Sequence, residues 1–368
     1  PAGVTDANGN PAAGVSITFA VSGGGGSILP VTPIATNASG IATLTQWVLG
    51  TVAGSNTVTA SAAGLTPSLL TFTATGAAGA AAQLQVQTQP SSSAQSGVAL
   101  AVQPAVRLAD VFGNPVTTNG TVVTAALALG SGTLGGTLTA STTSGVATFT
   151  NLSISGPSGT YAIRFTSGSL TPDTTAAITI GAGAASRLAM VTQPSTTAQN
   201  AVAFAQQRVQ VQDAAGNPVV GVRSVTAAIN AGGGTLGGTA TINTDASGLA
   251  TFAGLSITGT TGGRTLVFSS AGLTSIVSGT VTITAGAPTQ MAVNAGNGQS
   301  ATAGSPVAVD PSVVVRDVSN NPVPGVAVTF AVASGGGSVL PVAAVNTNAS
   351  GVAAATSVPR KVVAAVLP

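Results

Sequence analysis

The stretch DANGNPAAGVSITFAV, residues 6–21, contains the two patterns from which the fold can be predicted. Its second half alternates apolar residues with small or polar ones from Val15 to Val21. That period of two is typical of a β-strand with one buried face. Its first half, Asp6 to Pro11, has the residues of a tight turn, because Asp accepts backbone N–H groups, Gly or Asn tolerates a positive φ, and Pro restarts an extended strand. The stretch therefore predicts a turn followed by a strand.

The same turn pattern recurs three times further along the chain, as DVFGNP, DAAGNP and DVSNNP. The four closing prolines are 103 or 104 residues apart, and a second motif, TNASGIAT and its relatives, keeps nearly the same spacing. Equal spacing of two independent motifs indicates duplication of a unit of about 104 residues. The residues that we assign to these structural turns are Asp6, Gly9, Asn10 and Pro11; Asp110, Gly113, Asn114 and Pro115; Asp213, Gly216, Asn217 and Pro218; and Asp317, Asn320, Asn321 and Pro322.

The repeat divides the chain into four predicted modules joined by short Gly/Ala-rich segments. Joints this short favour neighbouring modules that contact each other rather than modules on long tethers. Compared with the repeat, the first module lacks its first strands and the last module lacks its last strands. The expected modules are module one at residues 1–78, module two at 79–182, module three at 183–286 and module four at 287–368.

The patterns inside each module are those of β-strands. Short alternating segments are separated by turn signals about every 8 to 12 residues, and no window shows helical periodicity. Units of this size with this spacing predict an Ig-like sandwich, here without the Cys–Trp–Cys mark of antibody domains. We therefore expect an all-β chain, a tandem array of Ig-like β-sandwich modules arranged end to end. Besides residues 14–21, the expected strands are 56–62, 69–75, 161–167, 225–231, 264–270 and 325–332.

The composition excludes most kinds of chemistry. Charged residues make up 4% of the chain, Cys and His are absent, and all seven acidic residues are Asp. Without His, Glu or Cys the usual general bases, thiol nucleophiles and zinc ligands are missing, so we predict no enzyme, no metal and no cofactor. The nine Lys and Arg are scattered apart from Arg360 and Lys361, so nucleic acid is not an expected partner. No run of about 18 apolar residues is present, and we expect no membrane span in this segment.

Several motifs have both a functional and a structural interpretation. A repeated Asp on a repeated turn could indicate calcium binding, but calcium takes about six to eight oxygen ligands and each module offers only one or two Asp. The Gly-rich segments 23–27 and 232–238 lack the Lys-Ser/Thr and helix of a phosphate-binding loop, so we interpret them as hairpin tips. Trp47 and Tyr161 are expected to pack in cores. The candidate N-glycosylation sites are Asn37, Asn119, Asn151 and Asn348, with O-linked sugars on the Ser/Thr surface as an alternative.

Two long segments carry a resemblance to a known family. VTDANGNPAAGVSITFAVSGGGGSILP, residues 4–30, and TNASGIATLTQWVLGTVAGSNTVTASAAG, residues 36–64, resemble the bacterial Ig-like group 1 repeats of invasin- and intimin-type surface proteins. Module four follows the same pattern to Val358, and modules two and three resemble a sister type found in long secreted bacterial repeat proteins. The resemblance implies a rigid extracellular rod that holds an adhesive tip away from the cell, and it provides no catalytic residues to carry over.

Three functions remain open. The leading hypothesis is a structural segment of a bacterial extracellular stalk or fibre. The second is a self-assembling filament subunit whose incomplete terminal modules are completed by strands from neighbouring chains. The third is an adhesin that binds a host protein or glycan through its loops. The expected partners are other copies, in head-to-tail or lateral self-association, and a glycan coat, and the expected location is extracellular or at the cell surface.

Overall fold

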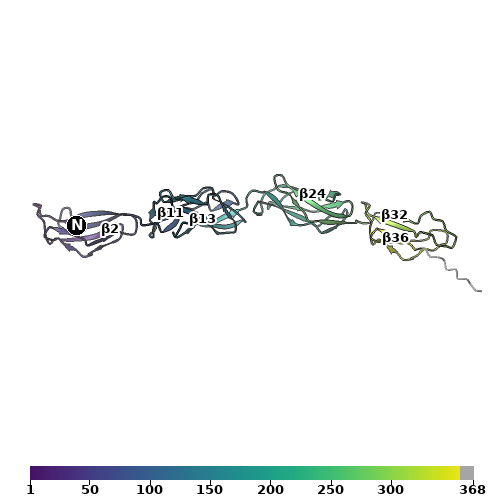
Figure 1. Cartoon of the computed structure of the whole chain (residues 1–368), viewed down its shortest axis with the longest axis horizontal. Helices are drawn as coiled ribbons and strands as arrows, with labels where there is room; N and C mark the ends of the chain where they lie inside the picture. The colour runs from purple at the N-terminus through teal and green to yellow at the C-terminus, as the bar shows by residue number, and fades with distance from the viewer. Residues whose placement is uncertain (357–368) are drawn as a thin grey trace, which may run out of the picture. The chain divides into compact units, whose positions relative to one another are not determined.

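The computed structural model describes residues 1–356, which form β-strands joined by turns and loops (Figure 1). These residues contain no helix, and so none that is long and apolar enough to cross a membrane. The all-β, Ig-like prediction is confirmed. The strands fall into four groups along the chain, and we use the four predicted modules as their names, while the exact module boundaries stay a prediction. The chain separates into two compact units, Pro1–Gly181 and Ala182–Pro368, which are described separately.

Module two shows the sandwich in full. One sheet has the strand order β10-β20-β18-β13-β15, and in the other β11 lies between β9 and β16. Buried side chains alternate along β13, as a period of two requires when one face of a sheet is covered, and in β18 Tyr161, Ile163 and Phe165 follow the same period while Ala162 between them is buried too. The strands are β9 (Gln83–Thr88), β10 (Ser93–Gln95), β11 (Ala105–Ala109), β12 (Pro115–Val116), β13 (Val122–Leu129), β14 (Thr133–Gly135), β15 (Thr139–Ser141), β16 (Val146–Thr148), β17 (Ser153–Ser155), β18 (Gly159–Thr166), β19 (Asp173–Thr174) and β20 (Ile178–Gly181).

Module three repeats this arrangement. Its sheets have the orders β22-β31-β29-β24-β26 and β21-β23-β27. The parallel pairing of β22 with β31 reproduces that of β10 with β20. The strands are β21 (Arg187–Thr192), β22 (Thr197–Gln199), β23 (Gln207–Gln212), β24 (Ser224–Ala231), β25 (Thr235–Gly237), β26 (Thr241–Asn243), β27 (Leu249–Phe252), β28 (Ser256–Thr258), β29 (Gly262–Ser269), β30 (Ile276–Val277) and β31 (Val281–Thr284).

The cores of modules two and three are mainly aliphatic, and each contains two phenylalanines whose rings lie next to each other. The rings of Phe149 and Phe165 lie 5.0 Å apart between centroids, and those of Phe252 and Phe268 lie 5.1 Å apart. Both pairs are tilted, an arrangement in the favourable range for aromatic side chains. Tyr161 is buried in the core of module two, as expected, and its hydroxyl group donates to the carbonyl oxygen of Pro157 at 2.8 Å.

Module one has fewer strands. Its larger sheet has the order β4-β2-β7-β8, so β8 is an edge strand of that sheet within the described residues. β1 pairs with β5, and no other strand of residues 1–356 lies beside it. The side chain of Trp47 is half-buried. The strands are β1 (Ala2–Gly3), β2 (Ser16–Gly23), β3 (Ser27–Leu29), β4 (Ile34–Ala35), β5 (Ile41–Ala42), β6 (Gln46–Val48), β7 (Gly54–Ser61) and β8 (Leu69–Gly76).

Module four corrects one sequence-based prediction. The strand expected over residues 325–332 is restricted to β34, and Val332 is 44% exposed. In module one the equivalent strand β2 pairs with β7 along most of its length, and the described part of module four has no strand in the place of β7. Without that partner the alternating pattern is not enough to form a strand. The strands are β32 (Gln290–Ala295), β33 (Ser312–Arg316), β34 (Ala327–Val328), β35 (Val345–Asn346) and β36 (Val352–Ala354).

Candidate functional site

The repeated turn closes in the same way in each module. In module two one carboxylate oxygen of Asp110, Oδ1, accepts the backbone N–H groups of Phe112 and Asn114, both at 2.9 Å. The backbone N–H of Asp110 donates to the carbonyl oxygen of Asn114, and the N–H of Gly113 donates to that of Asp110. The other three turns have the equivalent bond, in which Oδ1 of the Asp accepts the backbone N–H of the residue four positions on. The pairs are Asp6 with Asn10, Asp213 with Asn217, and Asp317 with Asn321.

The third residue after each Asp of the turn has a positive φ. The angle is 85° at Gly9, 87° at Gly113, 90° at Gly216 and 67° at Asn320. Glycine adopts this region without a steric penalty, and asparagine is one of the few other residues that tolerate it. This explains why module four has Asn-Asn where the other modules have Gly-Asn.

The second carboxylate oxygen, Oδ2, binds the segment that joins a module to the one before it. Gly79 donates its backbone N–H to Asp110 Oδ2 at 2.9 Å. Gly286 donates in the same way to Asp317 Oδ2 at 2.9 Å. Gly183 donates to Asp213 Oδ2 at 2.7 Å. The Asp of modules two to four therefore holds both its own turn and the Gly of the preceding joint.

In modules two and four the Asn of the turn reaches into the preceding module. Within the first unit, the amide nitrogen of Asn114, Nδ2, donates to the carbonyl oxygen of Thr51 at 2.8 Å, and its Oδ1 accepts the N–H of Ala53 at 2.8 Å. Thr51 and Ala53 belong to the loop between β6 and β7 of module one. The side-chain amide thus binds the oxygen of one residue and the N–H of the residue two positions on, as a neighbouring strand would do.

The second unit repeats this contact. Asn321 Nδ2 donates to the carbonyl oxygen of Gly259 at 2.8 Å, and Asn321 Oδ1 accepts the N–H of Thr261 at 2.9 Å. Gly259 and Thr261 lie in the loop between β28 and β29 of module three, the position that corresponds to the loop of Thr51. We call this two-bond contact the joint contact.

The second unit adds a further residue to its joint. Asn200, which follows β22, donates to Asp317 Oδ2 and to Ser319 Oγ, both at 2.9 Å. Its own Oδ1 accepts the N–H of Gly259 at 2.8 Å, so Asn200 connects both sides of the joint contact. The described part of module one has no strand in the place of β22, and Asn114 makes its joint contact without such a residue.

Each loop bound by the joint contact is also held by a buried polar side chain of its own module, and this side chain differs between modules one and three. In module one, buried Asn56 accepts the N–H of Gly50 at 2.9 Å and donates to the carbonyl oxygen of Gly54 at 3.2 Å. In module three, buried Arg264 donates to the carbonyl oxygen of Thr260 at 2.7 Å. A buried polar side chain with several backbone partners fixes the shape of a loop that contains few apolar contacts.

Burial and hydrogen bonds act in opposite directions on these carboxyl groups. Asp317 is 0% exposed, and burial alone would raise its pKa, but hydrogen bonds from Asn321, Gly286 and Asn200 lower the pKa to about 2. At Asp110 the side chain of Asn114 makes the largest contribution, and the pKa is again lowered to about 2. Each Asp of a joint is therefore ionised under all but strongly acidic conditions.

The carboxylates of the joints are occupied mainly by backbone and amide N–H groups, and the absence of a metal site stays a prediction. The Oδ1 and Oδ2 atoms of Asp317 accept five N–H groups, from Ser319, Asn321, Gly286 and Asn200, and these bonds use about all the acceptor sites of one carboxylate. Among residues 1–356 no group of three or more metal-binding side chains is found.

The four candidate glycosylation sites lie on the surface, and their modification stays a prediction. Asn37 and Asn348 are exposed, and the Oδ1 of each accepts two backbone N–H groups within a TNASG turn. Asn119 is exposed and accepts the N–H of Ser144. Asn151 is exposed and has a φ of 57°.

Sequence reasoning did not detect the role of the Asn in Asp-x-x-Gly-Asn-Pro, because a turn alone explains the motif. The joint contact ends on backbone atoms of the preceding module, so the receiving loop has no conserved side chain within this chain to mark it: the loops read TVAG at residues 51–54 and GTTG at 259–262. One available signal is the persistence of Asn at position five of all four turns, where no positive φ requires it.

The comparison with known proteins supports the family resemblance for module one. Residues 2–75 match the model of the bacterial Ig-like domain (group 1), which confirms the resemblance on those residues. A search of curated protein sequences finds no match.

Solved structures similar to this chain include FdeC, invasin and a fragment of intimin. The Escherichia coli adhesin FdeC is 19% identical over 76% of this chain and 89% of its own, with a TM-score of 0.33. Invasin, an integrin-binding protein, is 15% identical over 96% of this chain and 69% of its own, with a TM-score of 0.30. The D0-D1 domain of intimin is 17% identical over 55% of this chain and 98% of its own, with a TM-score of 0.21. At these values the likenesses carry no argument about function.

Proposed function

We propose that this chain is a non-enzymatic structural segment of a bacterial extracellular stalk or fibre, in which the repeated turns of modules two and four couple their modules to the ones before them. The observation that carries the proposal is the joint contact, made by Asn114 in the first unit and by Asn321 in the second. The extracellular location is supported by the family match of residues 2–75. The scarcity of charge and the absence of Cys, His and Glu support a role without catalysis.

The joint contact restrains the angle between two modules. A single hydrogen bond leaves rotation about its axis free, whereas two bonds from one planar amide to atoms two residues apart fix the approach of the loop. Asn114 is 8% exposed and Asn321 is 4% exposed, so water competes little for these bonds. Each such bond contributes about 0.5–1.5 kcal/mol, and leaving a buried partner unpaired costs about 1–3 kcal/mol. A stalk needs this kind of restraint, because bending at the joints would shorten its reach.

Spin-label distances across the first joint test the proposal. The chain contains no Cys, so labels at Thr71→Cys and Thr139→Cys, both exposed strand positions of modules one and two, would be the only two. We expect a narrow distance distribution, and a distribution at least about twice as wide after Asn114→Ala, since both bonds of the joint contact are lost. Asn10→Ala, the same change in the turn of module one, is the matched control and should leave the width unchanged.

An equally broad distribution with and without Asn114 would contradict the proposal, since the modules would then be connected only by the flexible segment between them. Broadening by Asn10→Ala as well would show that the labels report on general loss of stability instead of on the joint.

A second candidate function, the self-assembling filament subunit, rests on the apolar side chains of β8, an edge strand of its sheet within residues 1–356. Leu69 and Leu70 on this edge strand are 55% and 40% exposed. A long, apolar edge strand is a template for pairing with another chain. Electron microscopy of the protein at physiological salt tests this candidate, which predicts filaments many times longer than one chain. Particles of single-chain length only would overturn it.

A further inference from the structure

Modules two and three each pair a strand near their start with the strand at their end, and the two strands are parallel. In module two, β10 pairs with β20, from Ser93 opposite Thr179 to Gln95 opposite Gly181. In module three, β22 pairs with β31 in the same way. The other strand pairs of these two sheets are antiparallel. The parallel pair is therefore the one that connects the start of each module to its end.

Backbone hydrogen bonds continue each parallel pair beyond its strands. In module two, Thr179 donates its N–H to the carbonyl oxygen of Ser92 at 2.8 Å, and Ser96 donates to that of Gly181 at 2.9 Å. Module three has the same two bonds, at 2.8 and 2.9 Å, from Thr282 to Thr196 and from Asn200 to Thr284. Both modules thus have the same backbone connection between start and end, although their side chains differ.

The start segment of module three is fixed to its own module before it reaches the parallel pair. Gly183 donates its N–H to Asp213 Oδ2 at 2.7 Å. Thr274, in the loop before β30, accepts the N–H of Leu188 and donates to the carbonyl oxygen of Ser186, both at 2.9 Å. The segment then forms β21, which pairs with β23, and continues into β22. A pull on the incoming chain therefore acts on β22 from its first residue.

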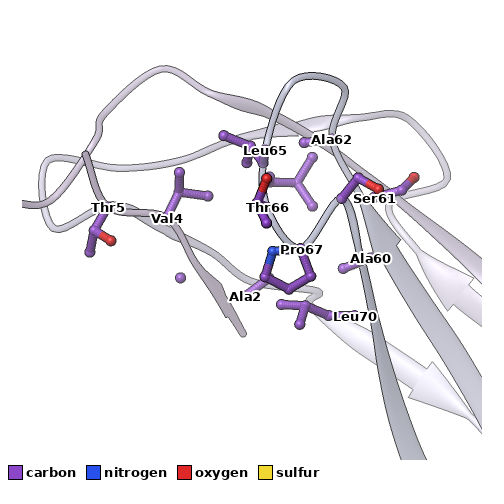
Figure 2. Close-up of a pocket in the computed structure, with 13 residues that line it drawn as sticks. Ala2, Val4, Thr5, Ala60, Ser61, Ala62, Leu65, Thr66, Pro67 and Leu70 are labelled. Carbon is purple, nitrogen blue, oxygen red and sulfur yellow. The ribbon is translucent and has the colours of Figure 1, made fainter. Parts of the chain in front are cut away.

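Module two fixes its start segment in the same way. Thr171 accepts the N–H of Leu84 and donates to the carbonyl oxygen of Ala82, both at 2.9 Å. Module one has the equivalent loop, in which Thr66 lines a cavity of about 280 Å³ together with Val4 (Figure 2). The loop is thus an element that the three modules share, and in modules two and three it binds the chain where it enters the module.

The far ends of the two parallel strands lie together at the next joint. Asn200 follows β22 and Gly286 follows β31, and both donate to Asp317 Oδ2 of module four at 2.9 Å. Both strands of module three therefore run toward module four and end beside it. A pull on the outgoing chain acts on β31 from its last residue.

This arrangement determines how tension acts on the pair. One strand is pulled back from its start and the other is pulled forward from its end, so the two strands are pulled in opposite directions along their common axis. All the bonds between them are then stretched together. A force across the strands would instead break the bonds one after another. The parallel orientation thus places the bonds in the geometry in which they share the load.

We propose that the parallel pairs β10–β20 and β22–β31 are mechanical clamps that keep modules two and three folded while the chain is under tension. This load-bearing role goes beyond the proposed restraint on bending, because the joint contact restricts the angle between modules and the clamp prevents a module from lengthening. Thr179 and Thr282 have no bond to a neighbouring module, so the clamp and the joint contact can be tested, and can fail, independently.

Forced unfolding of module two within the full chain tests the clamp. The chain contains no Cys, so DNA handles for optical tweezers can be attached at Ala77→Cys and Ala184→Cys, two exposed positions on either side of module two. Thr179→Pro removes the N–H that donates to Ser92. Because this bond must break before the module lengthens, we expect unfolding at constant force to be at least about fivefold faster than in the wild type.

Thr143→Pro is the matched control. Thr143 is also an exposed threonine of module two, and its N–H donates to the carbonyl oxygen of Val146 at 2.9 Å, in a turn that does not connect the two ends of the module. This turn should still be folded when β10 separates from β20, so the rate of unfolding under load should stay within about twofold of the wild type. Equal acceleration by the two substitutions, or none by Thr179→Pro, would overturn the proposal.

Module three provides an independent test if Thr179→Pro prevents module two from folding, which the loss of its unfolding step would reveal. Thr282→Pro removes the equivalent bond to Thr196, and handles at Ala184→Cys and Ala287→Cys place the load on module three. The same acceleration of at least about fivefold is expected. A variant that unfolds under load as slowly as the wild type would overturn the proposal and leave the role of the joint contact unaffected.

Discussion

The turns at Asp6 and Asp317 have the same local hydrogen bonds and very different surroundings. In both, Oδ1 accepts the N–H groups of the residues two and four positions on. Asp6 and Asn10 are exposed, whereas Asp317 and Asn321 are 0% and 4% exposed. The two turns differ in the partners of Oδ2 and of the Asn side chain. In module four, Asp317 Oδ2 accepts the N–H of the preceding joint, and the side chain of Asn321 binds the preceding module. The turn is therefore formed by local sequence, and its burial is provided by the neighbouring module.

This division explains why an Asp occupies the position despite the cost of burying a charge. A buried carboxylate is tolerated where hydrogen bonds replace its water shell, and bonds to charged groups are about twice as strong as neutral ones. At Asp317 five N–H donors supply this replacement. A Ser or Asn in its place would have fewer acceptor sites for the same donors.

The largest expected effect is that of Asp317→Ala. The substitution leaves five N–H groups without their acceptor, so we expect the local opening free energy of the Ser319 and Asn321 amides to fall by roughly 3 kcal/mol or more. Asp6→Ala is the matched change in an exposed turn, where water replaces the lost acceptor, and should cost about 1 kcal/mol. Native-state hydrogen exchange measures both. Equal losses at the two sites would show that the burial of Asp317 contributes nothing.

The second effect concerns the joint contact itself. Asn321→Ala removes the acceptor of the Thr261 N–H and the donor to Gly259, and we expect about 1–3 kcal/mol less protection at Thr261. The bonds from the backbone N–H groups of residues 319 and 321 to Asp317 Oδ1 do not involve the substituted side chain and should remain. Exchange at Thr261 in the Asn10→Ala chain provides the reference value and should equal that of the wild type. A loss confined to the turn amides, with Thr261 unaffected, would contradict the role assigned to Asn321.

The buried joints should lose stability in acid only at a pH below the pKa of an ordinary Asp. The pKa of Asp317 is lowered from 3.8 to about 2, so its contribution to stability is complete above about pH 4 and is lost as the pH falls toward 2. With no His or Glu in the chain, stability should be nearly constant between about pH 5 and 9. NMR of the carboxyl chemical shifts measures the titration of Asp317 in acid, and thermal melts measure the stability between pH 5 and 9. A melting midpoint that moves by more than about 5 °C between pH 5 and 9 would refute the second expectation.

The smallest difference between an exposed and a buried turn is expected when the Gly of the turn is replaced. Gly9→Ala and Gly113→Ala both place a side chain at a positive φ, and the added Cβ has no contact within 4 Å at Gly9 and only Gln85 Nε2 at 3.4 Å at Gly113. We expect each to lose about 1 kcal/mol at its own turn, because the strain is local. Hydrogen exchange at the N–H of Asn10 and Asn114 compares them. A much larger loss at Gly113 would mean that the turn and the joint contact are not separable.

Much of the fold could be predicted from local sequence patterns. The alternation in residues 14–21 predicted the strand found as β2, and the expected strands at 161–167 and 264–270 lie within two residues of β18 and β29. The failure at residues 325–332 has a physical cause, because a strand also needs a partner, and the alternating pattern cannot report whether one is present.

The candidate site was harder to predict than the fold. The Asp-x-x-Gly-Asn-Pro motif identified Asp110 and Asn114 as turn residues, but the partners of Asn114 are backbone atoms 61 and 63 residues earlier in the chain. No residue type is required at those positions, so no motif marks them.

The joint contact has a consequence for how such a chain changes in evolution. Asn114 and Asn321 both bind only a carbonyl oxygen and an N–H two residues apart, so the joint contact itself requires a loop of the same backbone shape in the preceding module and no particular side chain. Recombination that duplicates or deletes one unit of about 104 residues then creates a new joint without a compensating substitution. The number of modules can vary while the coupling between neighbours is retained, and side chains behind the loops, such as Asn56 and Arg264, are free to diverge from module to module.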